Sequence, residues 1–248
     1  SVSAGSMART TDAVRVVDPV HPTSQVLCRP DSFGDYAASC DILWNDPYPL
    51  PNQPLTMVDE WVRGGREAAL DRPYWTVLQG HDVRYWHEYE QAVEELGPVA
   101  LPTYTDTRCM AFTALCGGAN GLIWYWLPNS AYHIQRDAPN VWGGIEATVR
   151  ELNDLMPYLV AERTDADDVA VPDPLRAWSR AANGKRVLIV VNPTEETVRC
   201  EVDLPEFGRD GTIYLFNADG IIEADGDGPL ACTLTPHEVE IYEWRVQR

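Results

Sequence analysis

The sequence of 248 residues predicts an α/β region followed by an all-β region. Four short apolar runs, each too short for a helix, alternate with helix-length segments, which is typical of βα units and a parallel sheet. After about residue 162 the composition changes to many short β-like runs separated by turn signals, which is typical of a β-sandwich. We therefore expect two domains, residues 1–162 and residues 163–248.

The first region contains the four runs that we expect to form parallel strands, at residues 23–28, 41–46, 74–79 and 121–126. Asp18-Pro19 predicts the end of a first helix, because proline cannot continue one. The other helices are expected over residues 33–39, 55–70, about 105–116 and about 144–155. Thr105 or Asp106 is a suitable cap for the fourth of these five helices.

The second region begins with an acidic, proline-containing stretch at residues 165–174, as joints between domains often do. Strands are then expected at residues 176–179, 187–192, 197–204, 212–216, 221–223, 232–234 and 239–245. Turn signals such as Asn183-Gly184 and Asp210-Gly211 separate them. Regular turns between short strands favour an antiparallel architecture.

The net charge of −19 excludes several classes of partner. Such a field repels nucleic acid phosphates and anionic membranes, so we expect neither as a partner. We interpret the acid excess as an aid to solubility rather than as an acidic interaction surface. No apolar run is long enough to span a bilayer, which indicates a soluble protein. The sequence leaves open whether it is cytoplasmic or secreted with a leader upstream of residue 1.

The six cysteines indicate neither a disulfide framework nor a metal site. None of them forms a CxxC pair, and no cluster of cysteine and histidine has ligand spacing. The acidic stretch at residues 219–227 lacks the loop spacing of an EF-hand, and a hairpin explains it better. We therefore expect no metal and no organic cofactor.

Polar and aromatic side chains follow the ends of the four parallel runs. In parallel barrels the chemistry lies at the C-terminal ends of the strands. The side chains in question are Arg29, Asp31, Trp44, Asp46, Tyr48, Gln79, His81, Asp82, Trp124 and Trp126. Acids, amides and indoles that converge on one rim indicate a sugar site.

Four of these residues are candidates for catalysis. Asp46 either contacts sugar hydroxyls and assists the reaction or is a turn residue before Pro47. Gln79 is either a sugar ligand or a capped strand end. His81 and Asp82 are close enough in sequence to form an acid/base pair near pH 7.

The other six residues are candidates for substrate binding, and each has a purely structural alternative. Trp44, Trp124 and Trp126 either form the floor of a sugar subsite or pack in the core. Tyr48 either contacts the sugar or packs within the proline-rich loop. The side chains of Arg29 and Asp31 either bind substrate or form a salt bridge on the rim.

Five segments resemble the second half of a TIM-barrel glycoside hydrolase of the large retaining clan, clan A, and the β-sandwich that follows it. They are Asp18-Pro-Val-His-Pro-Thr23, Cys40-Asp-Ile-Leu-Trp-Asn-Asp-Pro-Tyr-Pro49, Arg72-Pro-Tyr-Trp-Thr-Val-Leu-Gln79, Arg108 to Trp126, and Leu152-Asn-Asp-Leu-Met-Pro157. The resemblance covers about residues 12–245. It implies a partial (β/α)8 barrel, with about strands 5–8, and a β-sandwich. It also implies part of an enzyme that cleaves O-glycosidic bonds of an oligo- or polysaccharide by acid/base carboxylate chemistry.

The sequence departs from this family in two ways. Strands 1–4 and the glutamate that follows strand 4 are expected upstream of residue 1. The position of the nucleophile is occupied by Gln79, and an amide does not form a glycosyl-enzyme ester. The alternatives are therefore a catalytically inactive carbohydrate-binding protein and a purely structural β-sandwich with a barrel remnant. Half a barrel has two open edges, so we expect a fragment that pairs with its missing N-terminal half or with a second copy of the chain.

Overall fold

The computed structural model describes residues 2–81, 101–125, 133–204, 212–216, 221–222 and 229–246. The chain divides into two compact units. Unit 1 comprises residues 1–102 and 117–139, and unit 2 comprises residues 103–116 and 140–248. The domain boundary expected at residue 162 stays a prediction.

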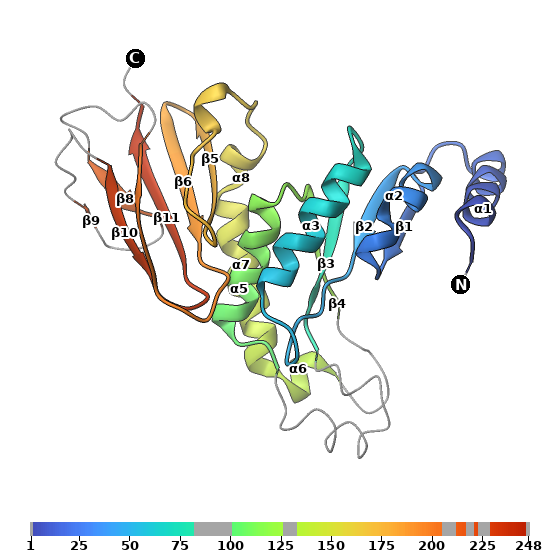
Figure 1. Ribbon diagram of the computed structural model, residues 1–248, viewed down its shortest axis with the longest axis horizontal. Helices are drawn as coiled ribbons and strands as arrows, with labels where there is room; N and C mark the ends of the chain where they lie inside the picture. The colour runs from blue at the N-terminus through green and yellow to red at the C-terminus, as the bar shows by residue number, and fades with distance from the viewer. Residues whose placement is uncertain are drawn as a thin grey trace. The chain divides into compact units, whose positions relative to one another are not determined.

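Unit 1 contains a four-stranded sheet in the order β1-β2-β3-β4. All three pairings are parallel (Figure 1). The strands are β1 (Ser24–Leu27), β2 (Ile42–Asn45), β3 (Tyr74–Gln79) and β4 (Gly121–Tyr125). All four expected parallel strands are therefore confirmed. Within the described residues the sheet does not close into a barrel, and β1 and β4 form its two edges.

The helices of unit 1 are α1 (Ala4–Val17), α2 (Phe33–Tyr36), α3 (Thr56–Ala69) and α6 (Ile134–Asp137), with 3-10 turns η1 (Pro30–Ser32) and η2 (Ala37–Ser39). The amphipathic helix expected over residues 55–70 is α3. It contacts β2 and β3. Val58, Val62 and Ala69 are fully buried, as the apolar spacing predicts. A Cβ atom at Gly65 would lie 2.2 Å from the Tyr74 hydroxyl oxygen. Glycine at this position therefore allows the helix to lie close to β3.

Unit 2 contains a five-stranded antiparallel sheet in the order β5-β6-β11-β8-β9 and a two-stranded antiparallel sheet of β10 and β7. The strands are β5 (Arg176–Ala182), β6 (Lys185–Val191), β7 (Val198–Val202), β8 (Ile213–Leu215), β9 (Ile221–Ile222), β10 (Leu230–Leu234) and β11 (Val239–Arg245). Alternate residues of both sheets form one apolar core, for example Leu188, Val202, Leu234 and Trp244. Each strand expected after residue 175 is thus present.

The helices of unit 2 are α5 (Tyr104–Cys116), α7 (Pro139–Asp154) and α8 (Met156–Leu159), with the 3-10 turn η4 (Asp165–Asp167). The expected cap of α5 was wrong. Thr103 caps this helix, because its hydroxyl accepts the backbone N–H of Asp106 at 3.1 Å. The Asp106 carboxylate in turn accepts the N–H of Thr103 at 2.9 Å. This is a capping box with Asp106 in its third position. The expected start of the next helix near Gly144 was also too late, since α7 begins at Pro139.

The acidic stretch at residues 165–174, which we expected to connect the two domains, contains a buried aspartate that is held by ion pairs. Asp167 is 8% exposed. Its carboxylate bonds the guanidinium groups of Arg186 at 2.6 Å and Arg180 at 2.8 Å. The hydrogen bonds from Thr164, Arg186 and Arg180 outweigh the effect of burial and lower the pKa of Asp167. This segment is therefore fixed to β5 and β6 by buried charge.

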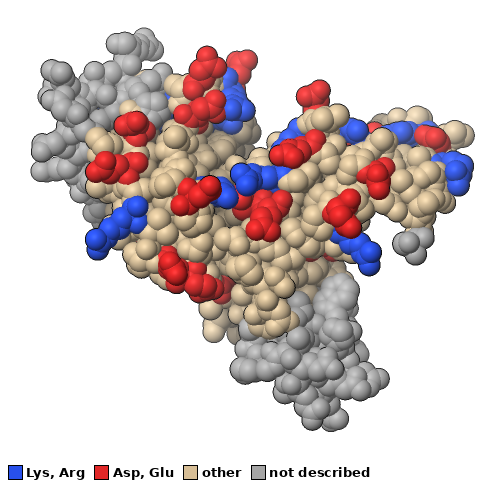
Figure 2. Space-filling view, in the orientation of Figure 1, with Lys and Arg blue, Asp and Glu red and all other residues tan. Residues whose placement is uncertain are grey.

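The surface charge is mixed where it is visible. On the face shown in Figure 2, acidic side chains lie among basic ones rather than in one patch. The role of the acid excess in solubility stays a prediction. Among the described residues no helix is long and apolar enough to cross a membrane.

Candidate functional site

The register of the parallel sheet sorts the candidate residues onto two faces. Trp44 pairs with Trp75, and Gln79 pairs with Tyr125. Because successive side chains alternate between faces and paired residues share one, these four lie on the same face. The opposite face carries Tyr74, whose hydroxyl donates to the Trp61 carbonyl oxygen of α3 at 3.3 Å. The helix therefore covers one face and leaves the other for a site.

The open face carries a pair of indoles. The rings of Trp44 and Trp75 have centroids 5.0 Å apart and are tilted by 31°. Both side chains are half-buried. Gly121, the register partner of Trp75, leaves room for the indole, because a Cβ atom there would lie 2.8 Å from the ring. The two rings together form a broad apolar surface with exposed area, which we name the tryptophan platform.

Asp46 follows directly on β2 at the C-terminal edge of the sheet. Its Oδ1 atom is buried and has no hydrogen-bond partner among the described residues. Burial raises the pKa of Asp46 to about 6, against a smaller lowering by its own backbone N–H. A carboxyl with this pKa exchanges its proton close to neutral pH, as a general acid or base must.

Gln79 has its side-chain amide engaged with the backbone. Its Oε1 atom accepts the N–H of Leu50 at 3.0 Å. Its Nε2 atom donates to the carbonyl oxygens of Leu50 at 2.9 Å and His81 at 2.8 Å. The side chain is fully buried. In this arrangement Gln79 fixes the proline-rich loop of residues 47–54 to the end of β3, the role of a capped strand end.

An aromatic cluster lies beside Gln79. Tyr48 stacks on Tyr125 with ring centroids 6.1 Å apart, and His81 meets both rings edge-on. His81 is fully buried, and its Nδ1 atom donates to the Tyr125 carbonyl oxygen at 3.1 Å. Burial, followed by the negative charge of Asp46, raises the pKa of Tyr48. The carboxyl of Asp46 is therefore close to this cluster.

The structure brings Trp44, Asp46, Tyr48, Gln79 and His81 to one edge of the sheet. Other predicted site residues lie elsewhere. Trp124 is the register partner of Leu78, so it lies on the face that α3 covers. Its indole nitrogen is buried without a hydrogen-bond partner among the described residues. Arg29 and Asp31 are exposed around the turn η1. Asp82 and Trp126 lie outside the described residues.

Two residues of this face were not recognised in the sequence, Trp75 and Tyr125. The signal for Trp75 is Gly121, which begins β4, but its meaning depends on the register between β3 and β4. Tyr125 lies between two tryptophans in one apolar run, and this run gives no signal that distinguishes it from its neighbours. Neither could be assigned to a face before the pairing partners were known.

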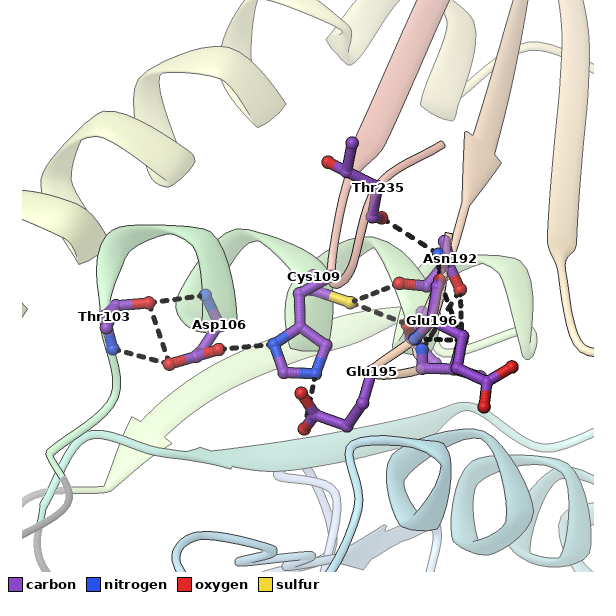
Figure 3. A network of polar contacts seen from close by, with 10 residues as sticks. Thr103, Asp106, Cys109, Asn192, Glu195, Glu196 and Thr235 are labelled. Carbon is purple, nitrogen blue, oxygen red and sulfur yellow. Dashed lines mark hydrogen bonds and ion pairs between the residues drawn. The ribbon is translucent and has the colours of Figure 1, made fainter. Parts of the chain in front are cut away.

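A second polar network lies in unit 2 (Figure 3). The Nδ1 atom of His237 lies 2.8 Å from the Asp106 carboxylate, and its Nε2 atom lies 3.1 Å from the Glu195 carboxylate. The hydrogen bond to Asp106 raises the pKa of His237. Asn192 nearby donates to the backbone carbonyl oxygens of Glu196, Leu234 and Thr235. These side chains hold backbone segments together, so we assign this network to stability.

No metal centre is apparent in the described part of the chain. No group of three or more histidine, cysteine, aspartate or glutamate side chains there is arranged to hold an ion.

Comparison of the sequence with known proteins gives no relatives. No protein-family model matches the sequence, and no curated protein matches it.

Comparison of the fold with solved structures does give similar proteins. The chain matches β-galactosidase from Bacillus circulans sp. alkalophilus with a TM-score of 0.63 and 10% identity, covering 98% of this chain and 66% of the other. A family 30 endoxylanase from Clostridium papyrosolvens matches with a TM-score of 0.52 and 9% identity, over 99% and 61% of the chains. AmyP in complex with maltose matches with a TM-score of 0.52 and 11% identity, over 98% and 62%.

These matches concern the fold. The expected resemblance to TIM-barrel glycoside hydrolases is confirmed at that level. The chain spans less than two thirds of the length of each of these three proteins.

Proposed function

We propose that this chain is a carbohydrate-active portion of a glycoside hydrolase. In this proposal β1 to β4 correspond to about strands 5–8 of a partial TIM-like barrel, and residues 163–248 correspond to the β-sandwich that follows. The fold likeness over nearly the whole chain supports it, as does the parallel order of the four strands. The proposal needs no metal or organic cofactor.

The observation that carries the proposal is the state of Asp46 beside the tryptophan platform. A glycosidase acid must hold a proton near neutral pH, which burial of a carboxyl group achieves. Asp46 has a pKa of about 6 and an unpaired oxygen at the sheet edge. In the proposed site it exchanges a proton with the glycosidic oxygen or with water. The indoles of Trp44 and Trp75 support the apolar face of a sugar ring.

A second candidate function is carbohydrate binding without hydrolysis, and the geometry of Gln79 favours it. Glycosidases need two carboxyl groups across the scissile bond. Gln79 occupies the position of the family's nucleophile, and its amide is fully used by backbone bonds. In a hydrolase we propose that the second carboxyl group comes from Asp82 or from an N-terminal barrel half.

The two functions are distinguished by one panel of sugars. The similar structures are a β-galactosidase, an endoxylanase and a maltose complex, so we choose β-galactosides, xylooligosaccharides and maltooligosaccharides as probes. Binding is measured by calorimetry, and hydrolysis by product chromatography, for the wild type and for Asp46→Asn and Trp75→Ala.

Hydrolysis that Asp46→Asn abolishes, together with binding that Trp75→Ala weakens, supports the hydrolase. Binding without turnover supports the binding protein. If the wild type shows neither binding nor turnover, even in a preparation that also contains an added barrel half, both proposed functions are overturned. A structural role then remains.

The proposal includes a partner for the open sheet. Within the described residues β1 and β4 each pair on one side only. Unpaired strand edges favour association with another strand. We propose the N-terminal barrel half or a second copy of the chain as that partner. Light scattering coupled to gel filtration tests the second possibility, since a concentration-independent monomer excludes it.

A further inference from the structure

Two cysteines of unit 2 are placed opposite one another. Cys200 on β7 is the register partner of Cys232 on β10. Both side chains belong to the apolar core between the sheets. Directly opposed residues of antiparallel strands have their side chains on the same face, with Cβ atoms about 4.5–5.5 Å apart. In the described strands no other two cysteines are register partners.

This geometry satisfies the requirements of a disulfide bond. Directly opposed residues of antiparallel strands have Cα atoms roughly 4.5–5.5 Å apart. Disulfides form across Cα separations of about 4.4–6.8 Å. Because the two residues are directly opposed in the strand pairing, the bond needs rotation of the side chains and little movement of the backbone.

We propose that Cys200 and Cys232 form an oxidation site, at which a peroxide produces a disulfide bond between β7 and β10. This inference is independent of the proposed function, since it concerns only unit 2. Both thiols are free in this structure.

The surroundings of the two sulfur atoms determine which thiol reacts first with the peroxide. Burial raises the pKa of both thiols, and that of Cys232 to about 12. Cys200 is 9% exposed and Cys232 is 3% exposed. The Cys232 sulfur lies 3.3 Å from the hydroxyl of Tyr242, which also donates to the Glu240 carboxylate. Because Cys200 is the more exposed of the two, we assign it as the thiol that meets the oxidant and Cys232 as the resolving thiol.

The reaction balances with one peroxide per disulfide bond. The Cys200 thiolate attacks one oxygen of hydrogen peroxide, the O–O bond breaks, and the other oxygen leaves as hydroxide and takes up a proton. Cys200 is now a sulfenic acid. The Cys232 thiolate then attacks the sulfur of the Cys200 sulfenic acid, and the S–O bond breaks. The leaving hydroxide takes up a proton and becomes the second water. The two thiols together lose two electrons, and the peroxide gains them and is reduced to two waters. Because the thiols are buried, the reaction is slow and accelerates with pH.

The bond is detected by a tryptic map without reduction. Trypsin cleaves after Arg199, Arg209 and Arg245, so Cys200 and Cys232 fall in separate peptides, residues 200–209 and 210–245. After treatment with hydrogen peroxide we expect these peptides linked, at a mass about 2 Da below their sum. We also expect the Tm of the oxidised protein to rise on the order of 5 °C, and the rise to vanish on reduction.

Matched variants separate this site from general oxidation. Cys200→Ala and Cys232→Ala are each expected to lose the linked peptide. Cys28→Ser is expected to keep it, because Cys28 is exposed and lies in unit 1. The proposal is overturned if the wild type gives only unlinked peptides, whether unmodified or carrying added oxygen. It is also overturned if Cys200 links to a different cysteine.

Discussion

The two units use buried polar groups in different ways. Unit 2 contains two networks of paired, largely buried charges: Arg186 and Arg180 share Asp167, and Arg108 makes two bonds of 2.7 Å to Glu151. At the sheet edge of unit 1, buried atoms of Trp44 and Asp46 have no partner among the described residues. Paired charges fix a fold, whereas an unpaired carboxyl beside half-buried indoles lowers stability and remains available to a ligand. The proposed function therefore uses this edge of unit 1 and not the charge networks of unit 2.

The largest expected effect comes from breaking the buried ion pair of unit 2. Arg186 is 1% exposed, so its replacement leaves the Asp167 charge buried and only partly compensated. We expect Arg186→Met to lower the free energy of unfolding by about 3–5 kcal/mol. Urea denaturation followed by circular dichroism measures this loss.

The matched control is Arg163→Met, which removes an exposed ion pair with Asp168. This substitution is expected to change the free energy of unfolding by less than about 1 kcal/mol. Equal effects of the two variants would contradict the claim that burial makes the first pair important.

The next effect tests whether Gln79 is a structural bridge or an altered nucleophile. In Gln79→Glu a carboxylate replaces the Nε2 donor, and the carbonyl oxygens of Leu50 and His81 lose their hydrogen bonds. We expect a loss of about 1–3 kcal/mol in unfolding free energy and no gain of hydrolysis. The control Gln53→Glu, at an exposed position of the same loop, should be neutral. A variant that hydrolyses sugars at undiminished stability would show that Gln79 is a lost nucleophile.

A smaller effect of opposite sign is expected at Asp46. Its raised pKa means that the folded state holds the proton more tightly than the unfolded state, so stability falls as pH rises from about 4 through about 6. Asp46→Asn removes this loss. Allowing for solvent screening, it should stabilise the protein at pH 8 by about 1–2 kcal/mol and leave stability at pH 3.5 unchanged. Thermal unfolding at the two pH values measures this, and destabilisation at pH 8 would refute it.

The smallest effect is expected at His237. Its backbone φ angle of +58° suits asparagine, so His237→Asn removes the charge without new strain. Because the pKa of His237 is raised, its ion pair stabilises the fold below its ordinary pKa of about 6.5, and this contribution disappears as pH rises through the raised value. Denaturation at pH 5.5 and pH 9 should give a difference between wild type and variant, on the order of 1 kcal/mol, at the lower pH only. An equal difference at both would exclude the charge as its cause.

Much of the fold could be predicted because its elements have strong local signals. The apolar runs that became β3 and β4 are bounded by Pro73 and by Gly121, and the apolar spacing of α3 is clear along the chain. The cap of α5 was misplaced because Thr103, Thr105 and Asp106 are all suitable cap residues. Only the hydrogen bonds between Thr103 and Asp106 decide among them.

The sequence predicted that Asp46 and Gln79 lie at a strand end but not what their side chains contact. A strand end marks Asp46 and Gln79 as rim residues in any parallel sheet. The sequence does not reveal that the side-chain amide of Gln79 forms hydrogen bonds with the backbone of Leu50, since the two residues are 29 positions apart. For the same reason it did not reveal that Cys200 faces Cys232.

The sequence by itself determined the order of strands and helices, the change from α/β to all-β structure, and the likeness to TIM-barrel glycoside hydrolases. The first two follow from local patterns of apolar residues, turns and breakers, and the likeness follows from the resemblance of five segments to that family. Only the tertiary structure decided which indoles share a face, which carboxyl is left unpaired, and which thiols meet. Those properties depend on register and burial, and a shift of one residue in strand pairing moves every side chain to the other face.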